Sequence, residues 1–172
     1  MVRALFPGTF DPIHYGHIDI ANRAARLFDE VVMAVYDKPL KSLIFSPEER
    51  MALVKEAFQD NPKIKVTGYS GLTVEFARKV GAQVIVRGLR VFSDFEFEFR
   101  MGLANQRLAS DIETVAFITA EEHTFLSSST VKEIASLKGD VSSMVPPVVE
   151  KALKAKVNSL GDGNAPPNAL RD

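Results

Sequence analysis

An α/β fold is predicted for this chain of 172 residues: a single domain with a doubly wound, five-stranded parallel sheet and helices on both faces. Three observations predict it. Short runs rich in β-branched residues recur along the chain, and segments that open with helix-start signals lie between them. This alternation implies right-handed crossovers, which place helices on both sides of a parallel sheet. The length suits one domain with a full core.

The five expected strands are short apolar runs separated by polar or turn-forming residues. They cover residues 4–6, 31–35, 64–67, 84–86 and 115–118. In a Rossmann-like sheet of this kind, ligands bind outside the carboxyl ends of the strands, near the point where the strand order reverses. The residues that follow these runs are therefore the candidates for a functional site.

The expected helices begin at recognisable N-terminal signals. The first covers residues 18–28. Ser46-Pro47-Glu48-Glu49 is a capping box with proline at the first helical position, and it opens a helix over 50–58. A shorter helix over 72–80 ends at Gly81.

Two further capping boxes are expected in the second half of the chain. Ser93-Asp94-Phe95-Glu96 opens a helix that runs to about Leu108, and Thr130-Val131-Lys132-Glu133 opens one that closes at Gly139. Pro146-Pro147 starts a last helix that ends at about Val157. We therefore expect one domain over 1–157 and a disordered tail over 158–172, which is rich in Gly, Asn and Pro.

The composition excludes several classes of function. The net charge of −1, from 21 basic and 22 acidic side chains, argues against a dedicated DNA or RNA surface. There are no cysteines, hence no disulfide, thiolate nucleophile or cysteine-bound zinc. No apolar run approaches the roughly 18 residues of a membrane span, so a cytoplasmic location and no membrane partner are expected. The P-loop motif is absent, as is a G-x-G-x-x-G after the first strand, which argues against ordinary P-loop enzymes and the usual mode of NAD binding.

The most informative segment is Pro7-Gly8-Thr9-Phe10-Asp11-Pro12-Ile13-His14-Tyr15-Gly16-His17. It joins the first expected strand to the first helix, where an α/β protein places backbone N–H groups and a helix N-terminus against a phosphate. His14 and His17 are three residues apart and would share a face of that helix. A phosphate there would meet N–H donors, the helix dipole and imidazole groups at once. The chain has one further histidine, His123, so a histidine-rich zinc site is not expected and no residue is assigned as a metal ligand.

Three other segments carry groups suited to a phosphate-rich ligand. Arg87-Gly88-Leu89-Arg90 is expected as a loop directly after the fourth strand, and guanidinium groups bind phosphate oxygens bidentately. His123-Thr124-Phe125-Leu126-Ser127-Ser128-Ser129-Thr130 follows the fifth strand, and hydroxyls beside unpaired N–H groups at a helix start make an anion site. Lys38 and Lys41 lie in the loop after the second strand, and their spacing does not choose between them.

These segments also carry a resemblance. Gly8-Thr9-Phe10-Asp11-Pro12 with His14-x-Gly16-His17 resembles the signature of the nucleotidyltransferase superfamily that shares its HxGH motif with class I aminoacyl-tRNA synthetases. The string of residues 123–132 resembles the second signature of that superfamily, ISS-[ST]-x-x-[RK], which grips the β- and γ-phosphates of the nucleotide. Arg87-Gly88-Leu89-Arg90 with Asp94-Phe95-Glu96-Phe97-Glu98, and Lys41 ahead of Glu48-Glu49-Arg50, are similar to bacterial phosphopantetheine adenylyltransferases, over about residues 3–156.

The resemblance implies an enzyme that transfers the adenylyl group of ATP to 4′-phosphopantetheine in coenzyme A biosynthesis, giving dephospho-coenzyme A and pyrophosphate. His17 would be the catalytic residue. The residues implied for the acceptor are Thr9, Lys41, Thr73 and Arg87. The residues implied for ATP are Thr9, Phe10, His17, Gly88, Leu89, Arg90, Glu98, His123, Thr124, Phe125, Leu126, Ser127, Ser128 and Ser129.

The resemblance further implies Mg²⁺ bound mainly by substrate oxygens and water, a homohexamer, and feedback binding of coenzyme A. Two departures from the family pattern are visible: Gly71 stands where some relatives have aspartate, and His14 where many have threonine. The alternatives are an adenylyltransferase for another acceptor such as nicotinate mononucleotide, whose enzymes share the opening motif but tend to be longer and lack the Arg87-to-Glu98 block, and a non-catalytic nucleotide-binding homologue. An RNA-binding module, suggested only by the HxGH motif, is disfavoured by the net charge.

Overall fold

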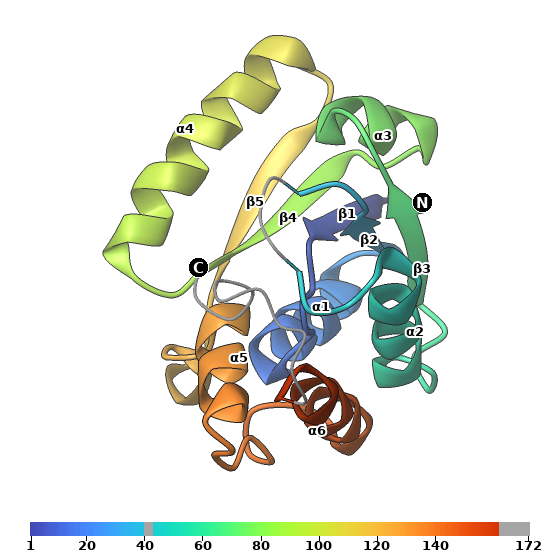
Figure 1. The fold of residues 1–172 in the computed structure, drawn as a ribbon. Coiled ribbons are helices and arrows are strands. Elements are labelled where there is room, and N and C mark those ends of the chain that lie inside the picture. The colour runs from blue at the N-terminus through green and yellow to red at the C-terminus, as the bar shows by residue number, and fades with distance from the viewer. Residues whose placement is uncertain (40–42, 162–172) are drawn as a thin grey trace.

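The computed structural model describes residues 1–39 and 43–161 (Figure 1). Its sheet contains β1 (Arg3–Gly8), β2 (Glu30–Tyr36), β3 (Ile64–Tyr69), β4 (Val84–Leu89) and β5 (Glu113–Ile118). The strand order is β3-β2-β1-β4-β5 and every pairing is parallel. All five predicted strands are confirmed. Because the chain moves outward from β1 to β3 and then crosses back to β4, the order reverses between β1 and β4.

The register of the central strands sorts their side chains onto two faces. Leu5 of β1 lies opposite Val32 of β2 and Ile85 of β4, and all three belong to one buried cluster. Their neighbours Ala4 and Phe6 point to the other face and join the larger cluster. Both faces of these strands are therefore covered, which explains why their sequences are short continuous apolar runs.

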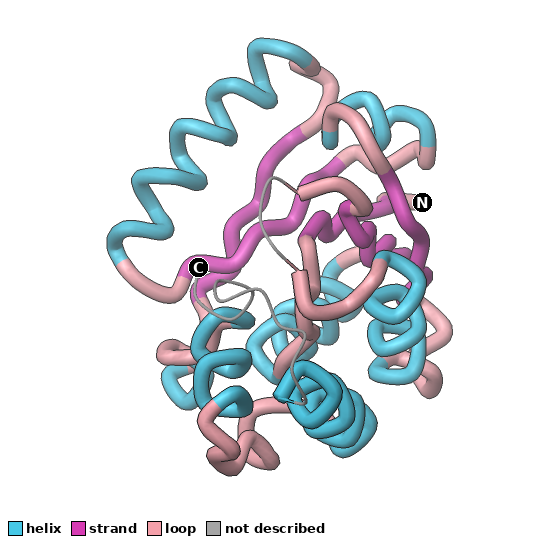
Figure 2. Tube along the Cα trace, viewed as in Figure 1, coloured by secondary structure: helices cyan, strands magenta, loops and turns pink. Residues whose placement is uncertain are grey.

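Helices cover both faces of the sheet, as predicted (Figures 1 and 2). The larger apolar cluster joins the sheet to α1 (Tyr15–Leu27), α2 (Pro47–Ala57), α5 (Ser128–Ser136) and α6 (Pro147–Gly161). The smaller cluster joins the opposite face to α3 (Thr73–Lys79). A short 3-10 turn, η1 (Glu121–His123), precedes α5. The doubly wound α/β fold expected from the sequence is confirmed.

The helix starts follow the sequence signals in part. The capping box at Ser46 is confirmed, because the Glu49 N–H donates to Ser46 Oγ (3.2 Å) and the Ser46 N–H to Glu49 Oε2 (2.8 Å). The box predicted at Ser93 is wrong: α4 (Phe92–Leu108) already begins at Phe92, and Asp94 accepts from Arg90 instead. The box predicted at Thr130 is also wrong, because α5 is capped by Ser127.

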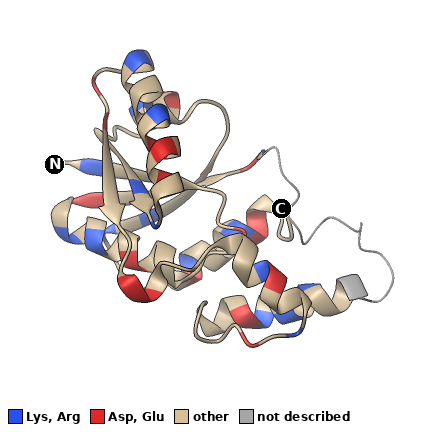
Figure 3. Ribbon diagram, turned by 90° about the vertical axis from the view of Figure 1, so that its left-hand side faces the viewer, with Lys and Arg blue, Asp and Glu red and all other residues tan. Residues whose placement is uncertain are grey.

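The last helix, α6, continues to Gly161, four residues past its expected end at Val157. The rest of the predicted tail, residues 162–172, lies outside the described residues. In the described part of the chain no helix has the length and apolar character needed to cross a membrane. Figure 3 shows basic and acidic residues interspersed along the helices rather than gathered by sign.

Helix α4 differs from the other long helices because none of its residues is buried. It lies along the β4–β5 side of the sheet (Figure 1). Its large exposed apolar side chains are Phe92, Phe95, Phe97, Phe99, Met101, Leu103 and Leu108. So many large exposed apolar side chains on one helix of 17 residues are typical of an interaction site.

Candidate active site

A cavity of about 340 Å³ lies where the strand order reverses, at the carboxyl ends of β1 and β4. Such a crevice is where open α/β sheets bind their ligands. The turn between β1 and α1, strand β4, helix α4 and the start of α5 all contribute to its lining. It brings together these predicted site residues: Thr9, Phe10, His17, Arg87, Gly88, Arg90, Glu98, Ser127, Ser128 and Ser129.

The two histidines of the first motif form the N-terminal cap of α1. The Gly16 N–H donates to His14 Nδ1 (3.1 Å), and the His14 N–H donates to His17 Nδ1 (3.3 Å). The two rings stack, with centroids 3.7 Å apart and planes 25° from parallel. Because each Nδ1 accepts a hydrogen bond, the proton of each neutral ring is assigned to Nε2. His17 therefore enters the cavity as an Nε2–H donor with a fixed tautomer.

The His14 ring of this stack is held neutral. His14 is only 4% exposed, and its pKa is lowered to about 3, first by burial and then by the nearby charge of Arg90 and by His123. Burial and the nearby positive charge disfavour the protonated form of the His14 ring. His14 thus supports His17 as an uncharged ring over the whole physiological pH range.

The backbone of the turn is strained at Phe10, whose φ is +52°. This left-handed conformation is uncommon for a bulky residue and is typically kept at functional sites. It buries the Phe10 ring edge-on against His17, with centroids 5.0 Å apart. Gly8 makes room for that ring, because a Cβ at Gly8 would lie 2.7 Å from Phe10 Cζ. The turn therefore packs His14 against the face of the His17 ring, and it packs Phe10 edge-on against the same ring.

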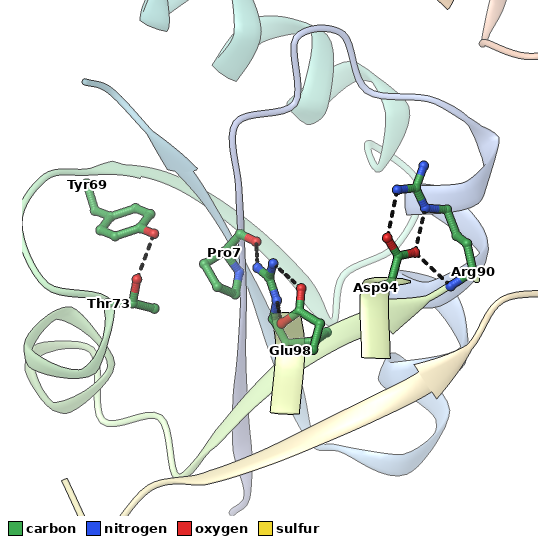
Figure 4. A network of polar contacts seen from close by, with 7 residues as sticks. Pro7, Tyr69, Thr73, Arg90, Asp94 and Glu98 are labelled. Carbon is green, nitrogen blue, oxygen red and sulfur yellow. Dashed lines mark hydrogen bonds and ion pairs between the residues drawn. The ribbon is translucent and has the colours of Figure 1, made fainter. Parts of the chain in front are cut away.

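Arg87 is held by Glu98, a carboxylate of α4 that is labelled in Figure 4. Its Nε and NH2 groups donate to Glu98 Oε2 (2.7 Å) and Oε1 (2.6 Å), and its NH1 group donates to the Pro7 carbonyl (3.1 Å). The sequence placed Arg87 in a loop, and this is wrong: β4 continues through Leu89, so Arg87 projects from the sheet itself. A strand holds a side chain more rigidly than a loop does.

Arg90 makes the same kind of contact with Asp94, which lies about one turn before Glu98 on α4 (Figure 4). It follows β4 directly, and its Nε and NH2 groups donate to Asp94 Oδ2 (3.0 Å) and Oδ1 (3.2 Å). Its NH1 group donates to the Leu126 carbonyl (2.8 Å) just before α5. Burial would raise the pKa of Asp94, but the hydrogen bonds from Arg90 outweigh it, so the pKa lies below its usual value. Two carboxylates of α4 therefore orient the two arginines of the cavity.

The serine run opens α5 at the cavity wall. Ser127 is the N-cap and its Oγ accepts from the Thr130 N–H (3.0 Å). The Ser128 hydroxyl donates to the Pro12 carbonyl (2.9 Å), which ties α5 to the histidine turn. The N-terminus of this helix adds N–H donors and a partial positive charge to the cavity, as an anion site requires.

The other predicted site residues that the structure describes do not line this cavity. Thr73 begins α3, and its hydroxyl is 3.1 Å from the Tyr69 hydroxyl (Figure 4). A second cavity of about 480 Å³ lies beside that segment, with Tyr69 and Leu72 among its walls. The other predicted residues that do not line the first cavity are Leu89, His123, Thr124, Phe125 and Leu126. Lys41 lies outside the described residues.

Three buried charged residues beneath the site were not predicted. Arg50, which is 0% exposed, donates to the carbonyls of Thr9 (2.7 Å) and Tyr36 (2.7 Å). Asp11 and Lys132 form a buried ion pair. Asp11 and Lys132 stand inside the two signature segments, and Arg50 stands in Glu48-Glu49-Arg50, which is also part of the resemblance. These segments are the signal that the sequence offers for the three residues.

Within residues 1–39 and 43–161 no group of three or more histidine, cysteine or acidic side chains is arranged to hold a metal ion. The two carboxylates of the cavity, Asp94 and Glu98, are each engaged by an arginine. A divalent cation in this cavity would therefore take its ligands mainly from phosphate oxygens and water, which is how Mg²⁺ usually binds with nucleotides.

A doubly wound sheet with an HxGH turn, two arginines and a helix start around the cavity defines a nucleotide-binding α/β protein. The cytidylyltransferase-like family matches residues 5–134, and the chain belongs to this family. Within it, the chain belongs with the bacterial phosphopantetheine adenylyltransferases, on the following similarities.

The relatives match nearly the whole domain. A phosphopantetheine adenylyltransferase of Roseiflexus sp. (strain RS-1) is 56% identical over 154 residues, which are 90% of this chain and 96% of that protein. That of Desulfitobacterium hafniense (strain DSM 10664 / DCB-2) is 50% identical over 153 residues, covering 89% and 94%. That of Staphylococcus haemolyticus (strain JCSC1435) is 49% identical over 154 residues, covering 90% and 96%.

Proposed function

We propose that this protein transfers the adenylyl group of ATP to 4′-phosphopantetheine, giving dephospho-coenzyme A and pyrophosphate in coenzyme A biosynthesis. The observation that carries the proposal is the convergence of His17, two oriented arginines and the α5 N-terminus on one cavity. The relatives named phosphopantetheine adenylyltransferase, at 46–56% identity, identify the acceptor.

The reaction needs no base from the protein. The phosphate of the acceptor is already an anion, and one of its oxygens attacks the α-phosphorus of ATP. A new P–O bond forms, the bond from the α-phosphorus to the bridging oxygen of the β-phosphate breaks, and pyrophosphate leaves with that electron pair. What the protein supplies is position and stabilisation of charge.

His17 is the group best suited to the α-phosphate. Its Nδ1 accepts from the His14 N–H, which assigns the proton of the ring to Nε2, the atom that would donate to an α-phosphate oxygen. Negative charge on that oxygen grows as the attacking and leaving oxygens share the phosphorus. A donor that is held in place before the reaction stabilises the transition state without reorganisation.

Different cationic side chains hold the attacking phosphate and the leaving pyrophosphate. Arg87, which lines the cavity together with Thr9, holds the attacking phosphate, and the arm of the acceptor extends toward Thr73. Arg90 and residues 127–129 hold the leaving pyrophosphate at the α5 N-terminus. Lys41 joins Arg87 in this proposal on the resemblance alone. Mg²⁺, held mainly by substrate oxygens and water, would supply neutralisation of the phosphate charge.

Self-association is part of the proposal. The exposed apolar side chains of α4 would be covered by further copies of the chain, in keeping with the hexamer implied by the resemblance. Feedback binding of coenzyme A, which shares the pantetheine arm and the adenylate, would occupy the same cavity. A cytoplasmic location follows from the supply of ATP.

Pyrophosphate release tests the proposed activity. The purified protein is incubated with ATP and Mg²⁺, and pyrophosphate is measured after addition of 4′-phosphopantetheine, nicotinate mononucleotide or no acceptor. We expect pyrophosphate release only when 4′-phosphopantetheine is the acceptor. Release with nicotinate mononucleotide would assign a different acceptor, and ATP binding without release under any condition would identify a non-catalytic homologue.

A further inference from the structure

A buried ion pair joins the two signature segments beneath the active-site cavity. Lys132 Nζ lies 3.1 Å from Asp11 Oδ2, and the two side chains are only 5% and 1% exposed. The residues are 121 positions apart in the chain. Asp11 belongs to the turn that carries His14 and His17, and Lys132 to α5. Neither residue lines the cavity.

Asp11 also holds a third segment. Its Oδ2 accepts from the Ile44 N–H (3.0 Å) and its Oδ1 from the Phe45 N–H (3.0 Å), directly ahead of α2. The carboxylate therefore has partners on both oxygens, as a buried charge requires. A single side chain thus connects the histidine turn, the segment before α2 and, through Lys132, the helix of the serine run.

The Lys132 contact fixes α5 to the turn. The hydrogen bond from the Ser128 hydroxyl to the Pro12 carbonyl does so as well. Together they set the position of residues 127–129, next to the leaving pyrophosphate, relative to His17, next to the α-phosphate. A displacement of about 1 Å between such groups is enough to lower a rate by roughly a hundredfold.

We propose that Asp11 and Lys132 are positioning residues for adenylyl transfer, and that Lys132, although it ends the second signature, is not a phosphate ligand. Its ammonium group is committed to Asp11 in the interior and acts by fixing α5 against the histidine turn. The claim that the pair positions groups for adenylyl transfer rests on the proposed function. The claim that Lys132 does not bind phosphate does not.

The burial of the pair gives the proposal a distinctive signature. Removal of one partner leaves an uncompensated buried charge, which disturbs the surroundings, whereas removal of both charges is often tolerated. Lys132→Met is therefore expected to be more harmful than Asp11→Asn combined with Lys132→Met. A lysine that binds phosphate would not behave in this way, because loss of Asp11 cannot restore its contact with the nucleotide.

The experiment compares Lys132→Met, the double variant with Asp11→Asn, and the exposed control Lys151→Met. The dissociation constant of ATP is measured by calorimetry without acceptor, and kcat by pyrophosphate release at a temperature where circular dichroism shows every variant folded. We expect Lys132→Met to lower kcat at least tenfold while ATP affinity changes less than threefold. The double variant should recover at least fivefold in kcat, and Lys151→Met should match the wild type.

Other outcomes overturn the inference. A tenfold or larger loss of ATP affinity in Lys132→Met, with no recovery in the double variant, would make Lys132 a phosphate ligand. An unchanged kcat in Lys132→Met would show that the pair positions nothing. If Lys132→Met does not fold, Lys132→Arg, which keeps the charge but moves it, is subjected to the same comparison. A wild type without turnover would refute the proposed function, and the ATP affinities would still decide whether Lys132 contacts the nucleotide.

Discussion

The neutral His14 beneath His17 makes the stability of the fold depend on pH in a predictable way. The folded protein holds the pKa of His14 at about 3, against 6.5 for an unperturbed histidine. Between these values the unfolded chain binds a proton that the folded chain does not, so stability rises with pH and is lost as the pH falls below about 6.5. One pKa unit corresponds to about 1.36 kcal/mol. Acidification from pH 7 to pH 5 should therefore cost the fold about 2 kcal/mol through His14.

The assay is urea denaturation of the wild type and of His14→Asn at pH 7, 6 and 5. Asparagine is a favoured N-cap and does not titrate in this range, so the variant keeps a cap for α1 and loses the proton linkage. Every other titrating group contributes to both proteins, and the difference between their slopes isolates His14. We expect the wild type to lose about 2 kcal/mol more than the variant between pH 7 and pH 5. Equal losses would refute the claim that His14 is buried and neutral.

Three further substitutions test the site. His17→Ala should lower kcat by about 10²–10³ with little change in ATP affinity, because a positioned donor acts on transition-state charge; near-normal turnover would remove His17 from the mechanism. Arg87→Ala should raise KM for 4′-phosphopantetheine roughly ten- to hundredfold and affect ATP binding less, and the reverse pattern in binding and kinetic measurements would exchange the roles of Arg87 and Arg90. Gly71→Asp should cost about 1 kcal/mol in chemical denaturation, because Gly71 has a φ of +82° but open space around it, and global unfolding of the variant would contradict this.

The sequence predicted the sheet well because its signal is local. A strand covered on both faces has to be apolar along its length, so the runs at residues 31–35 and 84–86 reveal themselves without any knowledge of their neighbours. The capping box at Ser46 is equally local, since both of its hydrogen bonds close within one helical turn. The HxGH turn was found for the same reason.

The errors concern residues whose state is decided by distant partners. Ser93 opens a pattern typical of a capping box, but Asp94 of that pattern is drawn to Arg90, and α4 starts earlier. Among four consecutive hydroxyl residues that can each cap a helix, the cap of α5 is Ser127 rather than Thr130. Arg87 ends the apolar run and so looked like a loop residue, although β4 continues past it.

The pairing of the supporting charges of the site could not be predicted. Arg87 is oriented by Glu98, and Asp11 meets Lys132 across 121 residues of sequence. No local pattern encodes such a pairing. The residues suited to the chemistry can therefore be recognised as sequence motifs. The contacts that hold them in place can be identified only in the folded structure.

Transfer of isotope from the acceptor phosphate tests the central claim most directly. The protein is supplied with ATP, Mg²⁺ and 4′-phosphopantetheine whose phosphate oxygens carry ¹⁸O, and the products are analysed by mass spectrometry. Because an acceptor oxygen attacks the α-phosphorus, we predict that all of the label is found in dephospho-coenzyme A and none in pyrophosphate. Labelled pyrophosphate, or formation of AMP without dephospho-coenzyme A, would contradict the account.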